Sequence, residues 1–481
     1  MNAADFQALL PLLVLSGGAV LLMLQIAFVR GVNRSAALAT LTLVLAALSC
    51  ASAVEQAPRQ VTPLLVMDAF ALLFCAVFCL AAAVTVLLSG DYISYHGDEP
   101  EEYFLLLVLS TLGACVLVSA NHVASLVLGL ELLSVSLYAL IAYPNKSILP
   151  LEAAIKYLVL SGTASATTLF GFALLYAATG TLAFDALGEQ LTATATGRPM
   201  LLLAGAMVFA GLGFKFSLVP FHLWTPDVYH GAPAPVTGFL ASVSKAAVFL
   251  VLLRLFLDAD LFRYRILVEL TGLIAILSML AGNLLALLQT NIKRMLAYSS
   301  IAHMGYLLLV FMVCIERDNR GLAVEAAAYY LIAYIATIIA AFGLLTLVSA
   351  RQVEREDVQL QHVSGLFWRQ PLLACLLLVA LLSLVGVPLT AGFIAKFYLV
   401  VAAVDGSNWV LLGALIVGSA IGIYYYMRVI YYMSRKPEQQ VSQAAPADGL
   451  AVRVLSGALI VIILLLGTVP QPLMAYIRSI L

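Results

Sequence analysis

The sequence of 481 residues has very little charge, because lysine, arginine, aspartate and glutamate together make up only 10% of it. A soluble domain carries about 25% of these residues. Hydrophobic residues reach 63% and the mean hydropathy is +1.06. The shortage of charge excludes a soluble globular protein and indicates a protein that crosses a membrane many times.

Other absences narrow the possible functions. The net charge is −1 and no basic tract is present, so no interaction with nucleic acid is expected. The six cysteines include no C-x-x-C pair, which argues against a bound zinc ion or iron–sulfur cluster and favours small buried residues. The first ten residues, MNAADFQALL, lack a basic n-region, so we interpret them as the start of an uncleaved first span.

Long apolar runs are what the sequence has in abundance. A helix needs about 20 residues to cross the hydrocarbon core. Because lipid cannot satisfy backbone hydrogen bonds, the predicted fold class is an all-α polytopic membrane protein. About fourteen spans are predicted, approximately at residues 6–29, 35–54, 67–89, 102–119, 121–142, 152–178, 199–224, 233–257, 266–288, 294–314, 322–349, 371–400, 408–432 and 450–470.

The basic residues outside the spans predict the orientation. Setting aside Lys215, Lys245 and Lys396, which lie deep within spans, leaves 21 of the 24 lysines and arginines, and placing the N-terminus outside puts 13 of them on the cytoplasmic side and 8 on the other. Because cytoplasmic loops are enriched in Lys and Arg, both termini are predicted to be periplasmic. The longest polar connections are 90–101, 180–198, 350–370 and 434–449, and the third of these could form an interfacial helix. None is long enough for a second domain, so a single membrane domain is expected.

Two of the predicted spans are interrupted. The seventh contains Gly211, Gly213 and Pro220, and the twelfth contains Gly386 and Pro388. Helix breaks at matching places in two halves are typical of repeated transporter folds with a site near the middle of the membrane.

We therefore predict two inverted five-helix repeats. The expected units are an N-terminal three-helix segment at 1–101, a first repeat at 102–257, a second repeat at 258–433, and a C-terminal linker and last helix at 434–481. The two breaks differ in register, since Lys215 precedes Pro220 by five residues whereas Lys396 follows Pro388 by eight.

Four ionisable residues lie deep within predicted spans: Glu131, Lys215, Lys245 and Lys396. Each costs at least about 2.5–3.5 kcal/mol at the bilayer centre. Loss of water disfavours the charged form of a lysine, whereas a nearby carboxylate favours it. A buried lysine with a movable carboxylate partner can therefore load and release a proton, and Glu131 is the natural partner for Lys215.

Each of these residues also has a simpler interpretation. A lysine can extend its side chain to the headgroups, although the helix break beside Lys215 and beside Lys396 indicates a hydrated cavity instead. Lys245 lies about ten residues from the nearest proline-rich span end, so the headgroup alternative stays more open there. The alternative for Glu131 is a protonated carboxylic acid that is hydrogen-bonded inside the bundle.

Further polar residues could relay protons between these charges. His222 lies seven residues after Lys215, and His303 lies among small and hydroxylated residues in AYSSIAHMGY. Each could instead be a packing histidine. Lys156 is another possible relay residue, although a helix-end pair with Glu152 at i, i+4 is the simpler interpretation. A water wire is suggested by the hydroxyl side chains of Ser161, Thr163, Ser165, Thr167, Thr168, Ser242 and Ser244.

Two long stretches carry a family resemblance. KFSLVPFHLWTPDVYHGAPAPVTGFLASVSK, which ends at Lys245, and NIKRMLAYSSIAHMGY at 291–306 resemble the antiporter-like membrane subunits of respiratory complex I. That superfamily also includes multisubunit cation/proton antiporters and membrane-bound hydrogenases. The resemblance runs from about Tyr103 to Tyr432. The W-T-P-D form is similar to one branch of the family, since two other branches typically carry W-L-P-D-A. Lys396 also argues against one of those two branches, in which a glutamate is expected at this place.

The resemblance implies a function for the four buried charges. Glu131 and Lys215 would be the coupled pair, Lys245 the connecting relay, Lys396 the exit-side residue and His222 a bridge. It implies a proton-translocating subunit of an NADH:quinone oxidoreductase, with NADH, FMN, iron–sulfur clusters and quinone on partner subunits and no cofactor or metal in this chain. The expected partners are the other membrane-arm subunits, including a neighbouring antiporter-like subunit, and the lipid bilayer of a bacterial inner membrane. A sodium/proton antiporter subunit and a purely structural anchor remain alternatives.

Overall fold

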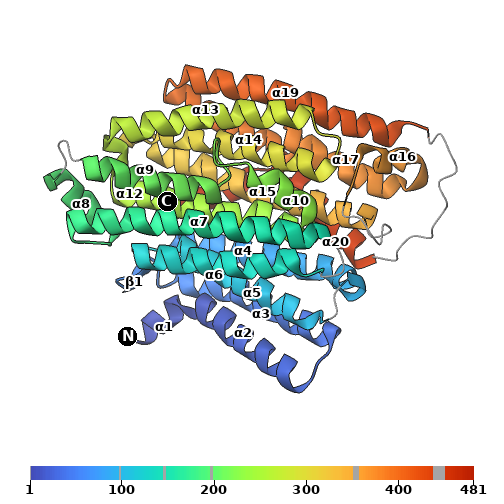
Figure 1. Ribbon diagram of the computed structural model, residues 1–481, viewed down its shortest axis with the longest axis horizontal. Helices are drawn as coiled ribbons and strands as arrows, with labels where there is room; N and C mark the ends of the chain where they lie inside the picture. Colours follow the sequence, from blue (N-terminus) through green and yellow to red (C-terminus); the bar gives the residue numbers. More distant parts are fainter. Residues whose placement is uncertain (1, 97–98, 145–147, 195–198, 350–356, 437–449) are drawn as a thin grey trace.

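Nearly the whole chain folds into long helices that run side by side (Figure 1). The computed structural model describes residues 2–96, 99–144, 148–194, 199–349, 357–436 and 450–481. Within these ranges, eleven helices are long and apolar enough to cross a membrane, or twelve if a bent pair near the C-terminus counts as one span. The all-α membrane fold is therefore confirmed, whereas the count of fourteen spans stays a prediction. Two further apolar helices, those of the interrupted seventh and twelfth spans, are shorter.

The N-terminal segment contains three long helices, and the first two of them lie at one edge of the bundle (Figure 1). The predicted first span is divided at Leu9, where Pro11 begins a new helix. A short antiparallel hairpin, which the sequence did not predict, pairs Arg59 with Met67 and Thr62 with Leu65. The elements are α1 (Ala3–Ala8), α2 (Leu10–Phe28), α3 (Val32–Val54), β1 (Arg59–Thr62), β2 (Leu65–Met67) and α4 (Ala69–His96).

The middle of the chain forms two groups of helices with similar features. The first group contains the broken seventh span, and the second contains the broken twelfth span. The first group is α5 (Glu101–Val118), α6 (Val123–Ala142), α7 (Ile148–Thr179), α8 (Phe184–Thr194), α9 (Pro199–Lys215), α10 (Trp224–Gly231), α11 (Ala234–Phe239) and α12 (Lys245–Asp258). The second is α13 (Arg265–Leu287), α14 (Ile292–Val313), α15 (Arg320–Ser349), α16 (Leu366–Arg369), α17 (Pro371–Val385), α18 (Ala391–Asp405) and α19 (Trp409–Ser434).

Close glycine contacts recur in both groups. A Cβ at Gly113 of α5 would lie 2.6 Å from the Leu133 nitrogen of α6, and one at Gly305 of α14 would lie 2.8 Å from the Met279 nitrogen of α13. Two isolated backbone bridges also correspond, because the N-cap of α6 pairs with Ala183 and the N-cap of α14 pairs with Gln359. These contacts are alike in the two groups, but the division into two five-helix repeats and their inversion both stay predictions.

The last two helices bend around the end of the second group. Between α20 (Leu450–Thr468) and α21 (Gln471–Ile480) the chain turns by 78° at a break of a few residues. Arg478 of α21 forms an ion pair of 2.7 Å with the buried Glu325 of α15. The bend therefore places α21 against the end of α15, where Tyr329 also donates a hydrogen bond of 2.6 Å to the Leu466 carbonyl oxygen.

Two smaller expectations need correction. The stretch 350–370 was predicted as a possible interfacial helix, but its described part, from residue 357, forms a 3₁₀ turn at Leu360–Val363 and the single helical turn α16 instead. Gly365 separates the two with φ +71, a left-handed conformation that ends a regular helix. Five cysteines are buried as expected, whereas Cys375 on α17 is exposed.

Candidate functional site

The seventh and twelfth spans are broken at the positions that their glycine and proline residues predict. Helix α9 ends at Lys215, and Pro220 in the following turn cannot donate a backbone hydrogen bond. Helix α17 ends at Gly386, whose φ of +89 is a conformation that other residues rarely adopt. Each break leaves backbone carbonyl groups without helical partners inside the bundle, and so each creates a polar place at the depth of the apolar core.

Lys215 is buried, with 5% of its surface exposed. Its Nζ donates hydrogen bonds of 2.8 Å to Ser134 Oγ of α6 and 2.6 Å to Ser161 Oγ of α7. Tyr138 lies 2.6 Å from the same Ser161 hydroxyl. The lysine therefore does not extend to a headgroup, and two helices supply its hydroxyl partners.

Glu131 lies one turn before Ser134 on α6 and is near enough to act electrostatically on Lys215 and Tyr138. Its Oε1 is buried and makes no hydrogen bond to the residues that the structure describes. The predicted pair thus interacts through space, and Ser134, one turn after Glu131 on the same helix, is a hydrogen-bond partner of the lysine. A carboxylate oxygen without a described partner can interact more strongly with Lys215 when the helices shift.

Lys245 is the most enclosed of the three predicted lysines, with 1% of its surface exposed. It follows a π-helical turn at Leu240–Ser244, and turns of this kind are frequent at functional sites. Its Nζ donates a hydrogen bond of 2.8 Å to Ser300 Oγ of α14 and lies 5.4 Å from the ring centre of Tyr229. Tyr334 of α15 donates to the same Ser300 hydroxyl over 2.8 Å.

His303 lies one turn after Ser300 and is 5% exposed. Its Nδ1 is 2.5 Å from the Tyr330 hydroxyl, and its ring lies 5.2 Å from that of Tyr334. Both Lys245 and Lys396 act on it electrostatically. His303 therefore lies between the two lysines, in a position suited to a relay.

Lys396 lies on α18, and its Nζ reaches back to the end of α17. It donates hydrogen bonds of 3.1 Å to the Leu384 carbonyl oxygen and 2.8 Å to that of Val385. A cavity of ≈10 Å³ separates it from His303, about enough for one water molecule. The four predicted charges therefore lie in series across the bundle as Glu131, Lys215, Lys245 and Lys396, which we call the charge row.

His222 lies in the break between α9 and α10 and is 7% exposed. Lys245 acts on it electrostatically, but neither ring nitrogen hydrogen-bonds to the residues that the structure describes. The Ser217 and Thr225 hydroxyls on either side are also buried without such partners. Buried polar atoms normally have a partner, and water supplies it where protein does not. The break is therefore suited to holding water between Lys215 and Lys245.

Lys156 lies away from the charge row, at a solvent-accessible cavity of ≈120 Å³ between α7, α10 and α14. Its Nζ pairs with Glu152 at 2.8 Å, as the simpler interpretation had it, and also with Asp227 at 2.9 Å. Arg294 of α14 binds the other Asp227 oxygen at 2.7 Å. Burial raises the pKa of Asp227, but the hydrogen bonds from Arg294 and Lys156 outweigh it and hold the pKa below its usual range.

The sequence missed several residues of the site. Lys293 is one of the 13 basic residues that the sequence analysis assigns to the cytoplasmic side, yet its side chain is fully buried. Ser134, Ser300 and Tyr334 were not singled out, although Ser300 lies three residues before His303 on the same face of α14. Of the hydroxyl residues proposed as a water wire, Ser161 contacts a lysine, whereas Thr163, Thr167, Thr168 and Ser242 donate to backbone carbonyls of their own helices.

Comparisons with known proteins agree with this geometry. Residues 120–422 match the family described as NADH:quinone oxidoreductase/Mrp antiporter, TM. A protein of Methylococcus capsulatus named NADH-quinone oxidoreductase subunit N is 48% identical over 476 residues, which cover 98% of this chain and 94% of the relative. A chain of respiratory complex I from Thermus thermophilus is 33% identical with a TM-score of 0.81 over 97% of this chain and 98% of that one. A chain of the Mrp complex from Dietzia sp. shares the fold, with a TM-score of 0.85 at 20% identity over 100% and 97%.

Proposed function

This chain belongs to the NADH:quinone oxidoreductase/Mrp antiporter membrane family, and we propose that it is a proton-translocating membrane-arm subunit of an NADH:quinone oxidoreductase. The relatives at nearly half identity over almost the full length carry the name of subunit N of that complex. This agrees with the branch that the W-T-P-D form and Lys396 predicted. Its partners are the other membrane-arm subunits, including a neighbouring antiporter-like subunit.

The observation that carries the proposal is the charge row. Lys215 and Lys245 donate to serine hydroxyls, and Lys396 donates to backbone carbonyls. A hydroxyl can both accept and donate a proton, and a neutral amine can accept one. Glu131 would control Lys215, Lys245 and His303 would carry the proton onward, with His222 as a bridge, and Lys396 would deliver it to the exit side.

The energy would come from the partner subunits. Moving one charge against the membrane potential requires about 2.3 kcal/mol per 100 mV. Oxidation of NADH and reduction of quinone, with FMN and iron–sulfur clusters, would take place on those partners, and this chain would contribute no redox site. A shift of α6 relative to α9 would change the separation of Glu131 and Lys215. Conformational work done by the partner subunits would in this way be coupled to proton uptake by Lys215. We place the complex in the bacterial inner membrane with both termini of this chain periplasmic.

The function is tested on the intact complex. An affinity tag on this chain in mild detergent is expected to recover NADH-oxidising subunits, and reconstituted vesicles are expected to translocate protons when NADH and a quinone are supplied. Translocation should be the same with sodium or potassium as the cation. Recovery without NADH-oxidising partners, together with sodium-dependent proton exchange, would instead establish a sodium/proton antiporter.

Glu131→Gln is expected to lower quinone-linked proton translocation several-fold without loss of assembly. Glutamine preserves the shape of the side chain but removes the negative charge that acts on Lys215. Because Glu131 Oε1 has no described hydrogen-bond partner, the substitution breaks no contact at that atom. Proton translocation and NADH oxidation with an artificial electron acceptor are measured on the same preparation. Equal loss of both activities would point to misassembly and contradict the assigned role.

A further inference from the structure

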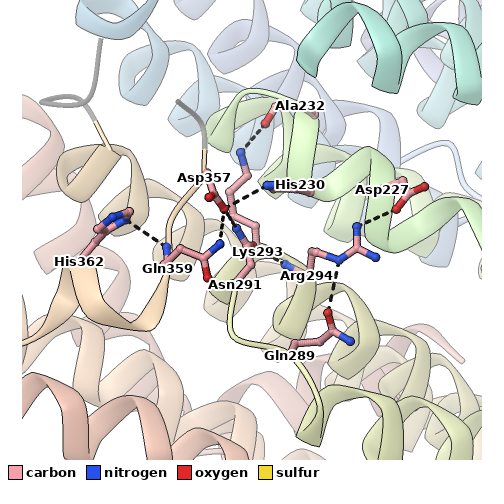
Figure 2. Close-up of polar contacts among 10 residues, drawn as sticks. All are labelled: Asp227, His230, Ala232, Gln289, Asn291, Lys293, Arg294, Asp357, Gln359 and His362. Carbon is pink, nitrogen blue, oxygen red and sulfur yellow. Dashed lines mark hydrogen bonds and ion pairs between the residues drawn. The ribbon is translucent and has the colours of Figure 1, made fainter. Parts of the chain in front are cut away.

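A second cluster of ionisable residues lies at the end of the bundle where α10, α14 and the segment 357–363 meet (Figure 2). Lys293, near the start of α14, is fully buried, and its Nζ donates a hydrogen bond of 2.7 Å to the Ala232 carbonyl oxygen at the end of α10. His230 Nε2 lies 3.2 Å from Asp357 Oδ1. The cluster is thus made of an amine, an imidazole and a carboxylate from three separate parts of the chain.

The three groups interact with one another. Lys293 acts electrostatically on His230, and Asp357 acts on both. Asp357 Oδ1 also accepts hydrogen bonds of 2.5 Å from Asn291 and 2.7 Å from Gln359, which hold the carboxylate in place (Figure 2). A change in the protonation of one group therefore alters the energy of the others.

Water reaches this cluster from one side. His230 and Gly231 line the cavity of ≈120 Å³ described above, which has room for several water molecules. The side chain of His230 is 23% exposed, whereas Lys293 is fully enclosed behind it. The imidazole thus lies at the edge of a cavity that is large enough to hold water, and the amine is enclosed. In the predicted orientation this end of the bundle is cytoplasmic.

Two helices lead from the cluster to the charge row. On α14, Ser300 lies seven residues after Lys293 and so on the same face, and it accepts the hydrogen bond of Lys245. On α10, Tyr229 precedes His230, and its hydroxyl lies 3.4 Å from Ser300 Oγ. A serine and a tyrosine hydroxyl therefore lie beside Lys245 on the two helices that also carry Lys293 and His230.

We propose that His230, Asp357 and Lys293 form a proton-loading site that supplies Lys245 from the cavity beside α10. The site rests on the proposed function. A water molecule in the cavity gives a proton to His230, the imidazolium passes it to the neutral amine of Lys293, and His230 returns to its starting form. The hydroxyls of Tyr229 and Ser300 then each accept one proton and release one, so that Lys245 gains the proton that Lys293 loses.

Charges on every side of His230 set its protonation. Burial lowers the pKa of His230, the positive charges of Lys293 and Arg294 lower it further, and Asp357 opposes them, so that the pKa stays below the usual value. Asp227, Glu152 and Lys156 face it across the cavity. The imidazolium becomes scarcer as the pH rises through this lowered pKa, and loading through His230 therefore slows as the pH rises from the acidic range toward neutral.

The first experiment measures the pH profile of proton translocation by the reconstituted complex. His230→Gln is expected to lower the rate several-fold at and below neutral pH and to abolish the part of the decline with rising pH that belongs to this histidine. The control is His362→Gln, which removes a histidine from the same end of the helix bundle. His362 accepts a hydrogen bond from the Gln359 backbone N–H but lies apart from His230 (Figure 2). A wild-type rate and profile for His230→Gln would overturn the proposal.

The second experiment separates proton transfer from packing. Lys293→Arg keeps a positive donor beside Ala232 but cannot release a proton at working pH, so translocation is expected to fall as far as in Lys293→Met. Normal translocation in Lys293→Arg would show that Lys293 only fastens α10, and would overturn the proposal. If neither variant assembles, His230→Gln decides, since its side chain is partly exposed. A loss in Lys215→Met without one in His230→Gln would remove this site but keep the proposed function.

Discussion

Lys215→Met is expected to abolish the proton translocation that passes through this chain, so that the protons moved per NADH fall by the full share of this subunit. Methionine fills a similar volume but can neither hold nor release a proton. NADH oxidation with an artificial acceptor should continue at the wild-type rate, because that reaction belongs to the partner subunits. The measurement is proton uptake by vesicles per NADH consumed.

The matched variant is Lys215→Arg, which keeps the positive charge and the donors to Ser134 and Ser161. Since arginine stays protonated, it should also block translocation, although assembly should match the wild type. If Lys215→Arg translocates normally, the role of Lys215 is electrostatic and it does not carry the proton. If Lys215→Met translocates normally, the structural-anchor alternative becomes the better account.

Gly392→Ala is expected to destabilise the complex more than other small substitutions in the second group of helices. A Cβ at Gly392 would lie 1.8 Å from the Ser383 carbonyl oxygen, so α18 would have to move away from α17. Overpacking of this kind typically costs about 1–3 kcal/mol. The shift would also weaken the 3.2 Å hydrogen bond from the Gly392 N–H to Ser383 Oγ and displace Lys396 one turn later.

Thermal unfolding and the yield of assembled complex measure this effect. The control is Gly413→Ala on α19, where a Cβ would meet nothing within 4 Å. Gly413→Ala should retain the melting temperature, because alanine favours the helix over glycine. Equal melting temperatures for the two variants would mean that the close approach at the break contributes little to stability.

The features that could be predicted from the sequence are those with a large penalty. Lys215, Lys245 and Glu131 were visible because a charge in a long apolar run is expensive and rare. The two breaks were visible because Pro220 and Gly386 cannot continue a regular helix. These penalties do not depend on neighbouring helices, and so they can be read from one segment at a time.

The partners of these charges could not be predicted in the same way. In the sequence, nothing separates the lysine-binding serines from the many serines that only pack helices or hydrogen-bond to their own backbone. What distinguishes them is a contact with a lysine far away in the sequence, and they are Ser134, Ser161 and Ser300. The sequence places Lys293 in a cytoplasmic connection because it lies at a helix end beside Arg294, in a polar stretch. Its burial depends on α10 folding over it, which only the tertiary structure reveals.

The hydrogen bonds of Lys396 have one more consequence. Lys215 interacts with a carboxylate that a mutation can remove, but the oxygens that hold Lys396 belong to the main chain at the C-terminus of α17, where the helix dipole favours a cation. A deprotonated amine still has two N–H groups to offer the same two carbonyls. Lys396 can therefore lose and regain a proton while it keeps its hydrogen bonds to the two carbonyl oxygens. A side-chain substitution elsewhere would not remove these main-chain acceptors.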